Sequence, residues 1–249
     1  MDQHGKFRSL VAAALIAGWA AGAAAQAPCR QALALGLDVS ASVDSREYRL
    51  QLEGLARALT APDVAARILE QPEVPVTLYV FEWSGPGVQR TVLDWTPVTG
   101  APVLNALAAQ IATHPRAAMG ASVDHSTAIA PAIAHALGKI TGETRCWKRT
   151  IDISGDGKHN TGGPPEALRA ALADAAVVVN GLVVGVDSPR GGDIRQLEVG
   201  ELSAYYNASV IYGPGAFVET ALGFKDFERA MRRKLLRELE GPVFGALSR

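Results

Sequence analysis

The sequence predicts one doubly wound α/β domain: a mostly parallel, six-stranded sheet with helices on both faces and one antiparallel edge strand. Three observations lead to this prediction. Short apolar runs such as residues 32–37 and 177–186 are typical of strands buried on both faces of a parallel sheet. Segments with apolar residues at helical spacing, such as 44–60, separate these runs. A single turn, 84–87, joins two strand-like segments as an antiparallel hairpin.

The first half of the chain is expected to alternate between the two kinds of element. Strands are expected at 32–37, 74–83 and 88–95, and helices at 44–60, 102–113 and 127–140. The helix over 44–60 is followed by Pro62, which we expect to lie beyond its end. Residues 74–83 are rich in β-branched and aromatic side chains, which favour a strand. Residues 115–126 show no periodic pattern, so we expect an irregular loop there.

The same alternation continues in the second half. Strands are expected at 149–153, 177–186 and 209–212, and helices at 165–175, 194–205 and 217–240. The helix at 165–175 begins with proline, which is favoured in the first helical turn. A basic run at 229–237 lies on the last helix with glutamates nearby, and we expect it to form a solvent-exposed face.

The first 25 residues predict an export signal that is removed from the mature protein. Lys6 and Arg8 precede a run of apolar and small residues, 10–25, which ends in three alanines. Alanines in this pattern mark a cleavage site, here before Gln26. We therefore expect a periplasmic or secreted protein. A retained membrane anchor is the alternative for this segment.

The rest of the chain suits one large domain, which we place at residues 28–241, followed by a C-terminal tail at 242–249. The net charge of the whole chain is −1 at pH 7, and no run of arginines alternates with aromatic residues. This composition argues against a nucleic acid as partner. No later run is long and apolar enough to predict a membrane span.

The motif Asp38-Val39-Ser40-Ala41-Ser42 lies between the first strand and the first helix. Open α/β sheets place their sites at the carboxyl ends of strands, and this motif puts three hard oxygen donors there. Such donors suit Mg²⁺, Ca²⁺ or Mn²⁺. The pattern Asp-x-Ser-x-Ser resembles the metal-ion-dependent adhesion site (MIDAS) of von Willebrand factor type A (vWA) domains. The same residues also suit a helix N-cap that needs no metal.

The resemblance covers most of the chain and implies two further ligands. A vWA site takes a threonine from a second loop and an aspartate from the loop after the fourth strand. Here these fall at Thr127 and at Asp156, while Gly155 replaces the usual threonine just before that aspartate, a position that is not a direct ligand. More narrowly, the chain resembles a little-characterised exported bacterial branch of these proteins.

The resemblance also implies what the site binds. Asp38, Ser40, Ser42, Thr127 and Asp156 would hold Mg²⁺, with Mn²⁺ or Ca²⁺ as alternatives. The cation would keep one open position for a carboxylate from an aspartate or glutamate of a partner protein or peptide.

The resemblance further makes the strands ending at Asp38 and Asp156 neighbours. Cys29 and Cys146 lie nine and ten residues before these aspartates, which would place both cysteines at the opposite edge of the sheet. We expect a Cys29–Cys146 disulfide, in keeping with an oxidising compartment.

Four other residues are candidates for the surroundings of the site. His125 and His159 flank the ligand loops, where they would either tune the rim or remain solvated. Asp152 lies inside a strand and needs a partner if it is buried. Asp187 follows the fifth strand on the same edge, in a candidate loop for partner recognition.

Two other functions compete with metal-dependent binding. A haloacid-dehalogenase-like, Mg-dependent phosphohydrolase also has a strand-end aspartate and a Gly-Asp-Gly motif. That class needs a second carboxylate two residues after the nucleophile, where this chain has Ser40. The other competitor is a metal-free scaffold. The chain has no serine-hydrolase, dinucleotide or P-loop motif, so we expect a binding protein and not an enzyme.

Overall fold

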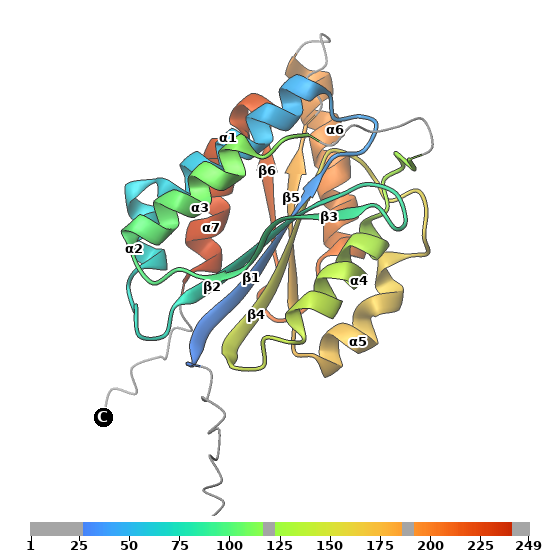
Figure 1. The fold of residues 1–249 in the computed structure, drawn as a ribbon. Coiled ribbons are helices and arrows are strands. Elements are labelled where there is room, and N and C mark those ends of the chain that lie inside the picture. The colour runs from blue at the N-terminus through green and yellow to red at the C-terminus, as the bar shows by residue number, and fades with distance from the viewer. Residues whose placement is uncertain (1–26, 117–122, 186–191, 241–249) are drawn as a thin grey trace, which may run out of the picture.

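A computed structural model describes residues 27–116, 123–185 and 192–240, with the backbone alone for 192–195. Its centre is a six-stranded sheet in the order β3-β2-β1-β4-β5-β6 (Figure 1). All neighbouring strands are parallel except β2 and β3, so the one antiparallel strand lies at an edge, as predicted. The strands are β1 (Cys29–Asp38), β2 (Val76–Trp83), β3 (Gln89–Pro97), β4 (Cys146–Gly155), β5 (Val178–Val184) and β6 (Val218–Ala221).

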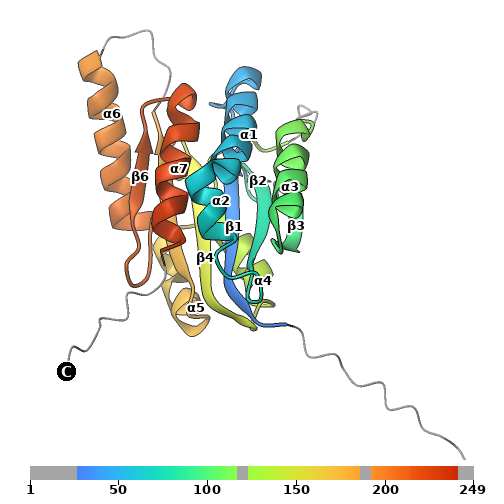
Figure 2. The same ribbon diagram turned by 90° about the vertical axis from the view of Figure 1, so that its left-hand side faces the viewer.

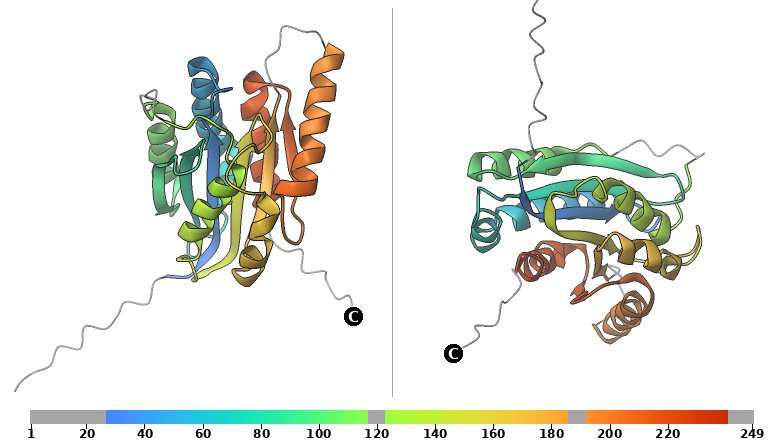
Figure 3. Two further views of the ribbon diagram at one scale, coloured as in Figure 1. Left: turned by 90° about the vertical axis from the view of Figure 1, so that its right-hand side faces the viewer. Right: turned by 90° about the horizontal axis from the view of Figure 1, so that it is seen from below.

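Helices cover both faces of the sheet and complete the doubly wound architecture. One face carries α1, α2, α3 and α7 (Figure 2), and the other carries α4, α5 and α6 (Figure 3). The α-helices are α1 (Ser45–Thr60), α2 (Pro62–Ile68), α3 (Ala101–Thr113), α4 (Ile129–Ile140), α5 (Arg169–Asp174), α6 (Gly192–Tyr205) and α7 (Phe227–Glu238). Short helical segments are η1 (Pro165–Leu168), η2 (Tyr206–Val210) and η3 (Phe224–Asp226). Among the described residues, no helix is both long and apolar enough to cross a membrane.

The central strand β1 separates two hydrophobic cores. Leu33, Leu35 and Leu37 belong to the core beneath α1 and α7. Ala32 and Ala34 point to the opposite face and belong to the core beneath α4. Because side chains alternate along a strand, an apolar run is needed to fill both cores, as the sequence predicted.

The register of the sheet brings the ends of β1, β2 and β4 to one edge. Asp38 pairs with Trp83 of β2, and Leu37 pairs with Ser154 of β4. The loops that follow β1 and β4 therefore begin side by side. This side of the sheet, where the carboxyl ends of the parallel strands lie, is called the carboxyl edge below.

The opposite edge of the same strand pair carries a disulfide. Cys29 and Cys146 are direct partners in the β1–β4 ladder, their Cα atoms are 4.3 Å apart, and their sulfur atoms are bonded. The predicted pairing is confirmed, together with the neighbouring strands on which it depends.

Two stretches differ from the prediction. The expected strand at 209–212 is largely π-helical, in η2, and Tyr212 makes only an isolated bridge with Val179. The expected long helix from 217 instead begins with β6, because the backbone of this stretch completes the open edge of β5. Pro62 lies beyond the end of α1, as predicted, and it opens the separate helix α2, since proline fits the first helical turn.

The basic run at 229–237 is solvent-exposed only in part. Arg232 and Arg233 form surface ion pairs with Asp63 and Glu219, as expected of an exposed face. Lys234 is completely buried, and for this residue the prediction was wrong. A buried ammonium requires counter-charges, and α7 places it against the sheet where it finds two carboxylates.

Those carboxylates are Asp152 of β4, 2.9 Å from Lys234 Nζ, and Glu238, 2.6 Å from it. Burial raises the pKa of Asp152 to about 7, although Lys234 opposes the shift. For Lys234 itself burial disfavours the charge, but the two carboxylates outweigh it and raise its pKa. Asp152 thus has the partner that we expected a buried aspartate to need, and it forms a structural ion pair in the core.

Removing the disulfide should destabilise the domain without changing its carboxyl edge. The bridge spans 117 residues of sequence, and the chain-entropy model assigns about 4–5 kcal/mol to a loop of that size. In a Cys29→Ala/Cys146→Ala variant we expect the melting temperature to fall by roughly 10 °C. Circular dichroism melting of both proteins checks this. An unchanged melting temperature would contradict the assigned role of the bridge.

Candidate metal centre

Three loops meet at the carboxyl edge: residues 39–44 after β1, 124–128 before α4 and 156–160 after β4. Their backbones are joined directly. Ala41 N donates to the carbonyl of His125 at 2.9 Å, and Asn160 N donates to the carbonyl of Thr127 at 3.0 Å. The loops that carry the five predicted ligands are therefore neighbours in space.

Asp38 occupies the last position of β1 and is almost completely buried. Its Oδ1 accepts a 2.8 Å hydrogen bond from Ser40 N, which turns the chain back over the carboxylate. Its main-chain carbonyl accepts from Gln51 Nε2 of α1 at 3.0 Å. Its Oδ2 has no hydrogen-bond partner among the described residues. One oxygen of the carboxylate is thus fixed and the other remains available.

The two serines connect Asp38 to Asp156. The hydroxyls of Ser40 and Ser42 lie 3.2 Å apart, and Ser42 Oγ donates to Asp156 Oδ1 at 2.7 Å. Neither serine caps α1. That role belongs to Asp44, whose Oδ1 accepts from the backbone nitrogens of the first helical turn. The N-cap interpretation of the motif is therefore wrong, and the serine hydroxyls point instead to the cluster around Asp156.

Thr127 lies next to the loop that carries Asp156. Its backbone is held by Asn160, whose Oδ1 accepts from Thr127 N at 3.0 Å. A Cβ placed on Gly157, the residue after Asp156, would lie 3.5 Å from Thr127 Oγ1. The Thr127 hydroxyl therefore borders the loop of Asp156, although this threonine precedes α4 and does not begin it as predicted.

Burial makes ionisation of both aspartates costly. It raises the pKa of Asp38 from 3.8 to about 7, with a further contribution from the nearby Asp156 charge, while hydrogen bonds from Ser40 oppose the shift. Burial also raises the pKa of Asp156, and the Ser42 hydroxyl partly offsets this. Two buried carboxylates that repel each other are stabilised when a cation supplies the missing positive charge.

The donor set fits a hard divalent cation. It comprises two carboxylates and three hydroxyls, and one carboxylate oxygen, Asp38 Oδ2, is buried without a partner among the described residues. Oxygen donors of this kind suit Mg²⁺, Mn²⁺ and Ca²⁺ and do not favour softer metals. Among the described residues there is also no group of three or more His, Cys, Asp or Glu side chains suited to a metal. A cation at this cluster would therefore take hydroxyl oxygens as well as carboxylate oxygens.

The other predicted residues have different positions. His125 contributes its backbone carbonyl to the loop contact, and its side chain is partly exposed. His159 is also partly exposed, and burial lowers the pKa of its imidazole. Asp152 is paired with Lys234 in the core and does not belong to the cluster. Asp187 lies outside the described residues.

One residue of the centre was not predicted. Tyr206, in the π-helical segment after α6, is completely buried, and its pKa is raised by burial and then by the charges of Asp38 and Asp156. The one indication of Tyr206 in the sequence is the glycine at position 155, because a residue without a side chain leaves space for the side chain of another residue.

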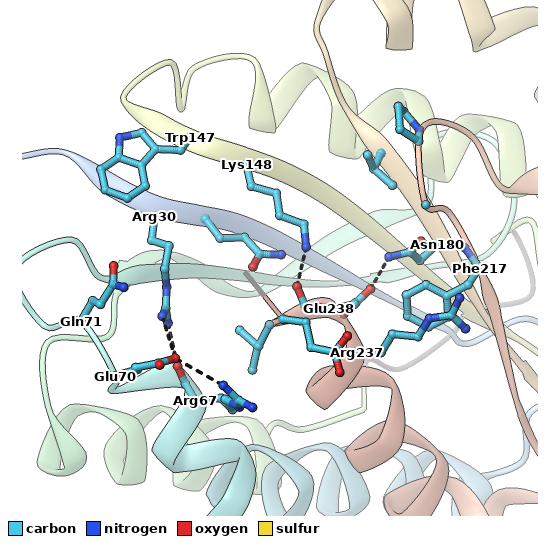
Figure 4. A pocket seen from close by; sticks show the side chains of 16 residues that line it. Arg30, Arg67, Glu70, Gln71, Trp147, Lys148, Asn180, Phe217, Arg237 and Glu238 are labelled. Carbon is cyan, nitrogen blue, oxygen red and sulfur yellow. Dashed lines mark hydrogen bonds and ion pairs between the residues drawn. The ribbon is translucent and has the colours of Figure 1, made fainter. Parts of the chain in front are cut away.

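One hollow lies beside the cluster and another lies far from it. One of about 340 Å³ adjoins Asp156 and is lined by residues that include Val184, Gly185, Val199 and Leu202. The larger one, of about 950 Å³, lies at the opposite edge of the sheet (Figure 4). There Arg30 donates to the last carbonyls of α2 and Lys148 donates to the carbonyl of Glu238 in α7. These cations stabilise helix C-termini, which explains their position without a ligand.

Replacing Asp38 with asparagine should stabilise the metal-free protein at high pH. Because the folded state holds the proton of Asp38 more tightly than the unfolded state, its stability falls as pH rises from about 4 through 7. Asparagine cannot ionise and avoids this loss. In EDTA we expect Asp38→Asn to melt several degrees above the wild type near pH 8 and to match it more closely near pH 5. An equal difference at both pH values would contradict the raised pKa.

Several solved structures share this architecture at low sequence identity. Proximal thread matrix protein 1 from the mussel byssus matches with a TM-score of 0.54 and 14% identity, over 86% of this chain and 48% of that chain. Another structure of the same protein, described as having a zinc-occupied MIDAS motif, gives 0.54 and 15% over 85% and 48%. The pilus adhesin SpaC from Lactobacillus rhamnosus GG gives 0.53 and 11% over 85% and 30%. This chain thus spans about half the length of the matrix protein and less than a third of the length of the adhesin.

A further match names the fold directly. A von Willebrand factor type A protein from Catenulispora acidiphila gives a TM-score of 0.50 and 15% identity, over 85% of this chain and 43% of that chain. No curated protein matches the sequence. The family model described as "Protein of unknown function (DUF1194)" matches residues 28–243, which is most of the chain. The chain therefore has a vWA-type fold and belongs to the DUF1194 family.

Proposed function

We propose that this protein is an exported vWA domain that binds a divalent cation and, through it, a carboxylate of a partner protein or peptide. Asp38, Ser40, Ser42, Thr127 and Asp156 would hold the cation. Mg²⁺ is the first candidate, with Mn²⁺ and Ca²⁺ as alternatives, because all five side chains offer hard oxygen donors.

One observation carries the proposal. Asp38 and Asp156 are buried side by side at the carboxyl edge, and neither has a cationic partner among the described residues. The nearest lysine in sequence, Lys158, pairs with Glu201 instead. Buried carboxylates without a counter-charge are strongly unfavourable, so a cation from solution would stabilise this pair.

The likeness to other vWA structures supports a binding role. One of them is described with a zinc-occupied MIDAS motif, and another is described as a pilus adhesin. A bound cation in this chain would act as an electrophile for a partner carboxylate. The adjoining hollow of about 340 Å³ offers room for a neighbouring side chain of that partner. Its lining is mixed, with apolar and charged side chains: Val184, Val199, Leu202, Lys158, Glu198 and Glu201.

The proposal requires that the protein is exported to the periplasm or to the exterior. We place the signal peptide at residues 1–25, the domain at 28–241 and a tail at 242–249. The Cys29–Cys146 disulfide supports an oxidising compartment such as the periplasm or the exterior.

Titration calorimetry with Mg²⁺ and Mn²⁺ tests the metal site. The wild type should bind one ion, and Asp38→Ala should lose binding while remaining folded, since it removes the strand-end ligand. Asp94→Ala on β3 is a matched control, because Asp94 is exposed and lies outside the cluster. Equal affinities in the wild type and in Asp38→Ala would refute the site.

The same three proteins test the binding of a partner. Immobilised wild type and Asp94→Ala should retain the same proteins from a periplasmic extract in Mg²⁺ and release them in EDTA, and Asp38→Ala should retain none of them. Retention that is insensitive to EDTA and to Asp38→Ala would favour the metal-free scaffold.

A further inference from the structure

Two glycines in neighbouring strands make room for one tyrosine. A Cβ on Gly155 of β4 would lie 2.6 Å from the hydroxyl of Tyr206, and a Cβ on Gly181 of β5 would lie 2.7 Å from Tyr206 Cδ1. Neither glycine has a positive φ, so the backbone does not require glycine at these positions. Glycine weakens a strand interior. Its presence at both positions is explained by the tyrosine that crosses them.

The helix that carries this tyrosine is distorted at the same point. Tyr206 begins the π-helical segment η2, directly after α6. Single π-helical turns are rare and often lie at functional sites, because the extra residue redirects a side chain. Here the redirected ring lies against the sheet with no exposed surface, and its hydroxyl reaches the carboxyl edge beside Gly155.

The Tyr206 hydroxyl and Asp38 Oδ2 border the same small space. The Cβ position of Gly155 lies 2.6 Å from the hydroxyl and 3.0 Å from the carboxylate oxygen. Both atoms are buried, and neither has a hydrogen-bond partner among the described residues. A buried donor and a buried acceptor that are both left unsatisfied cost free energy, which a bond between them would recover.

We propose that the Tyr206 hydroxyl is the hydrogen-bond donor for Asp38 Oδ2, reached directly or across one water, and that it positions this carboxylate for the cation. The proposal rests on the metal site proposed above. In this role Tyr206 is a positioning residue, since it acts through Asp38 and does not itself hold the metal.

Removing the hydroxyl alone tests this role. Tyr206→Phe keeps the buried ring, and Tyr205→Phe is the matched control on the adjacent, partly exposed tyrosine. A hydrogen bond to a charged group corresponds to about a tenfold change or more in affinity. By calorimetry with Mn²⁺, Tyr206→Phe should bind at least about tenfold more weakly than Tyr205→Phe. Affinities within twofold of each other would overturn the proposal.

Moving the hydroxyl to position 155 separates hydrogen bonding from packing. In the Tyr206→Phe background the clash at Gly155 is reduced, so a small side chain can be added there. Gly155→Ser/Tyr206→Phe should bind Mn²⁺ more tightly than Gly155→Ala/Tyr206→Phe, which fills the same space without a hydroxyl. Equal affinities of these two double variants would show that the hydroxyl is not what matters and would overturn the proposal.

A measurement without metal keeps the inference independent of the proposed function. In EDTA at pH 8, Tyr206→Phe should lower the urea midpoint of the wild type and leave that of Asp38→Ala unchanged, because the hydroxyl then has lost its acceptor. Equal lowering in both backgrounds would overturn the contact. If the wild type binds no cation but this coupling is found, the metal site fails and the contact between Tyr206 and Asp38 stands.

Discussion

The parallel pairing of β1 with β4 is the constraint on which the rest of the molecule depends. The ladder begins at Cys29 and Cys146, which are disulfide-bonded, and it ends one residue before Asp38 and two residues before Asp156. A covalent bond thus fixes the register at one edge, and the two carboxylates come together at the other. A shift of the register by one residue would turn every side chain of β1 to the wrong core. The register that fills the two cores therefore also places Asp38 and Asp156 side by side.

Strand β4 shows two solutions to the problem of a buried carboxylate. Asp152, in the strand interior, forms an ion pair with the ammonium of Lys234 on α7. Asp156, just beyond the strand end, accepts a hydrogen bond from the hydroxyl of Ser42. Its acidic neighbour Asp38 accepts one from the backbone nitrogen of Ser40. The first carboxylate is neutralised within the protein. Asp38 and Asp156 have no such cationic partner among the described residues, and this contrast distinguishes a structural ion pair from a candidate binding site.

The sheet was predictable because it follows from local patterns, whereas the five ligands stay a prediction that came from strand-end oxygens and from the resemblance to vWA domains. Apolar runs and helical spacing gave the strands and most helices, and strand-end oxygens pointed to the carboxyl edge. Features that depend on tertiary contacts were not predictable. Residues 218–221 form a strand only because β5 has an open edge, and Lys234 is buried only because α7 lies over Asp152. Tyr206 was missed for the same reason, since the glycines that admit it are on two other elements.

Crystals grown with Mn²⁺, with anomalous diffraction measured at the manganese edge, test whether the cluster of Asp38 and Asp156 holds a cation. We expect one strong anomalous peak at the carboxyl edge, within coordinating distance of side-chain oxygens from the loops after β1 and β4 and from Thr127. A peak held by other residues, or no peak in crystals soaked at millimolar Mn²⁺, would contradict this expectation.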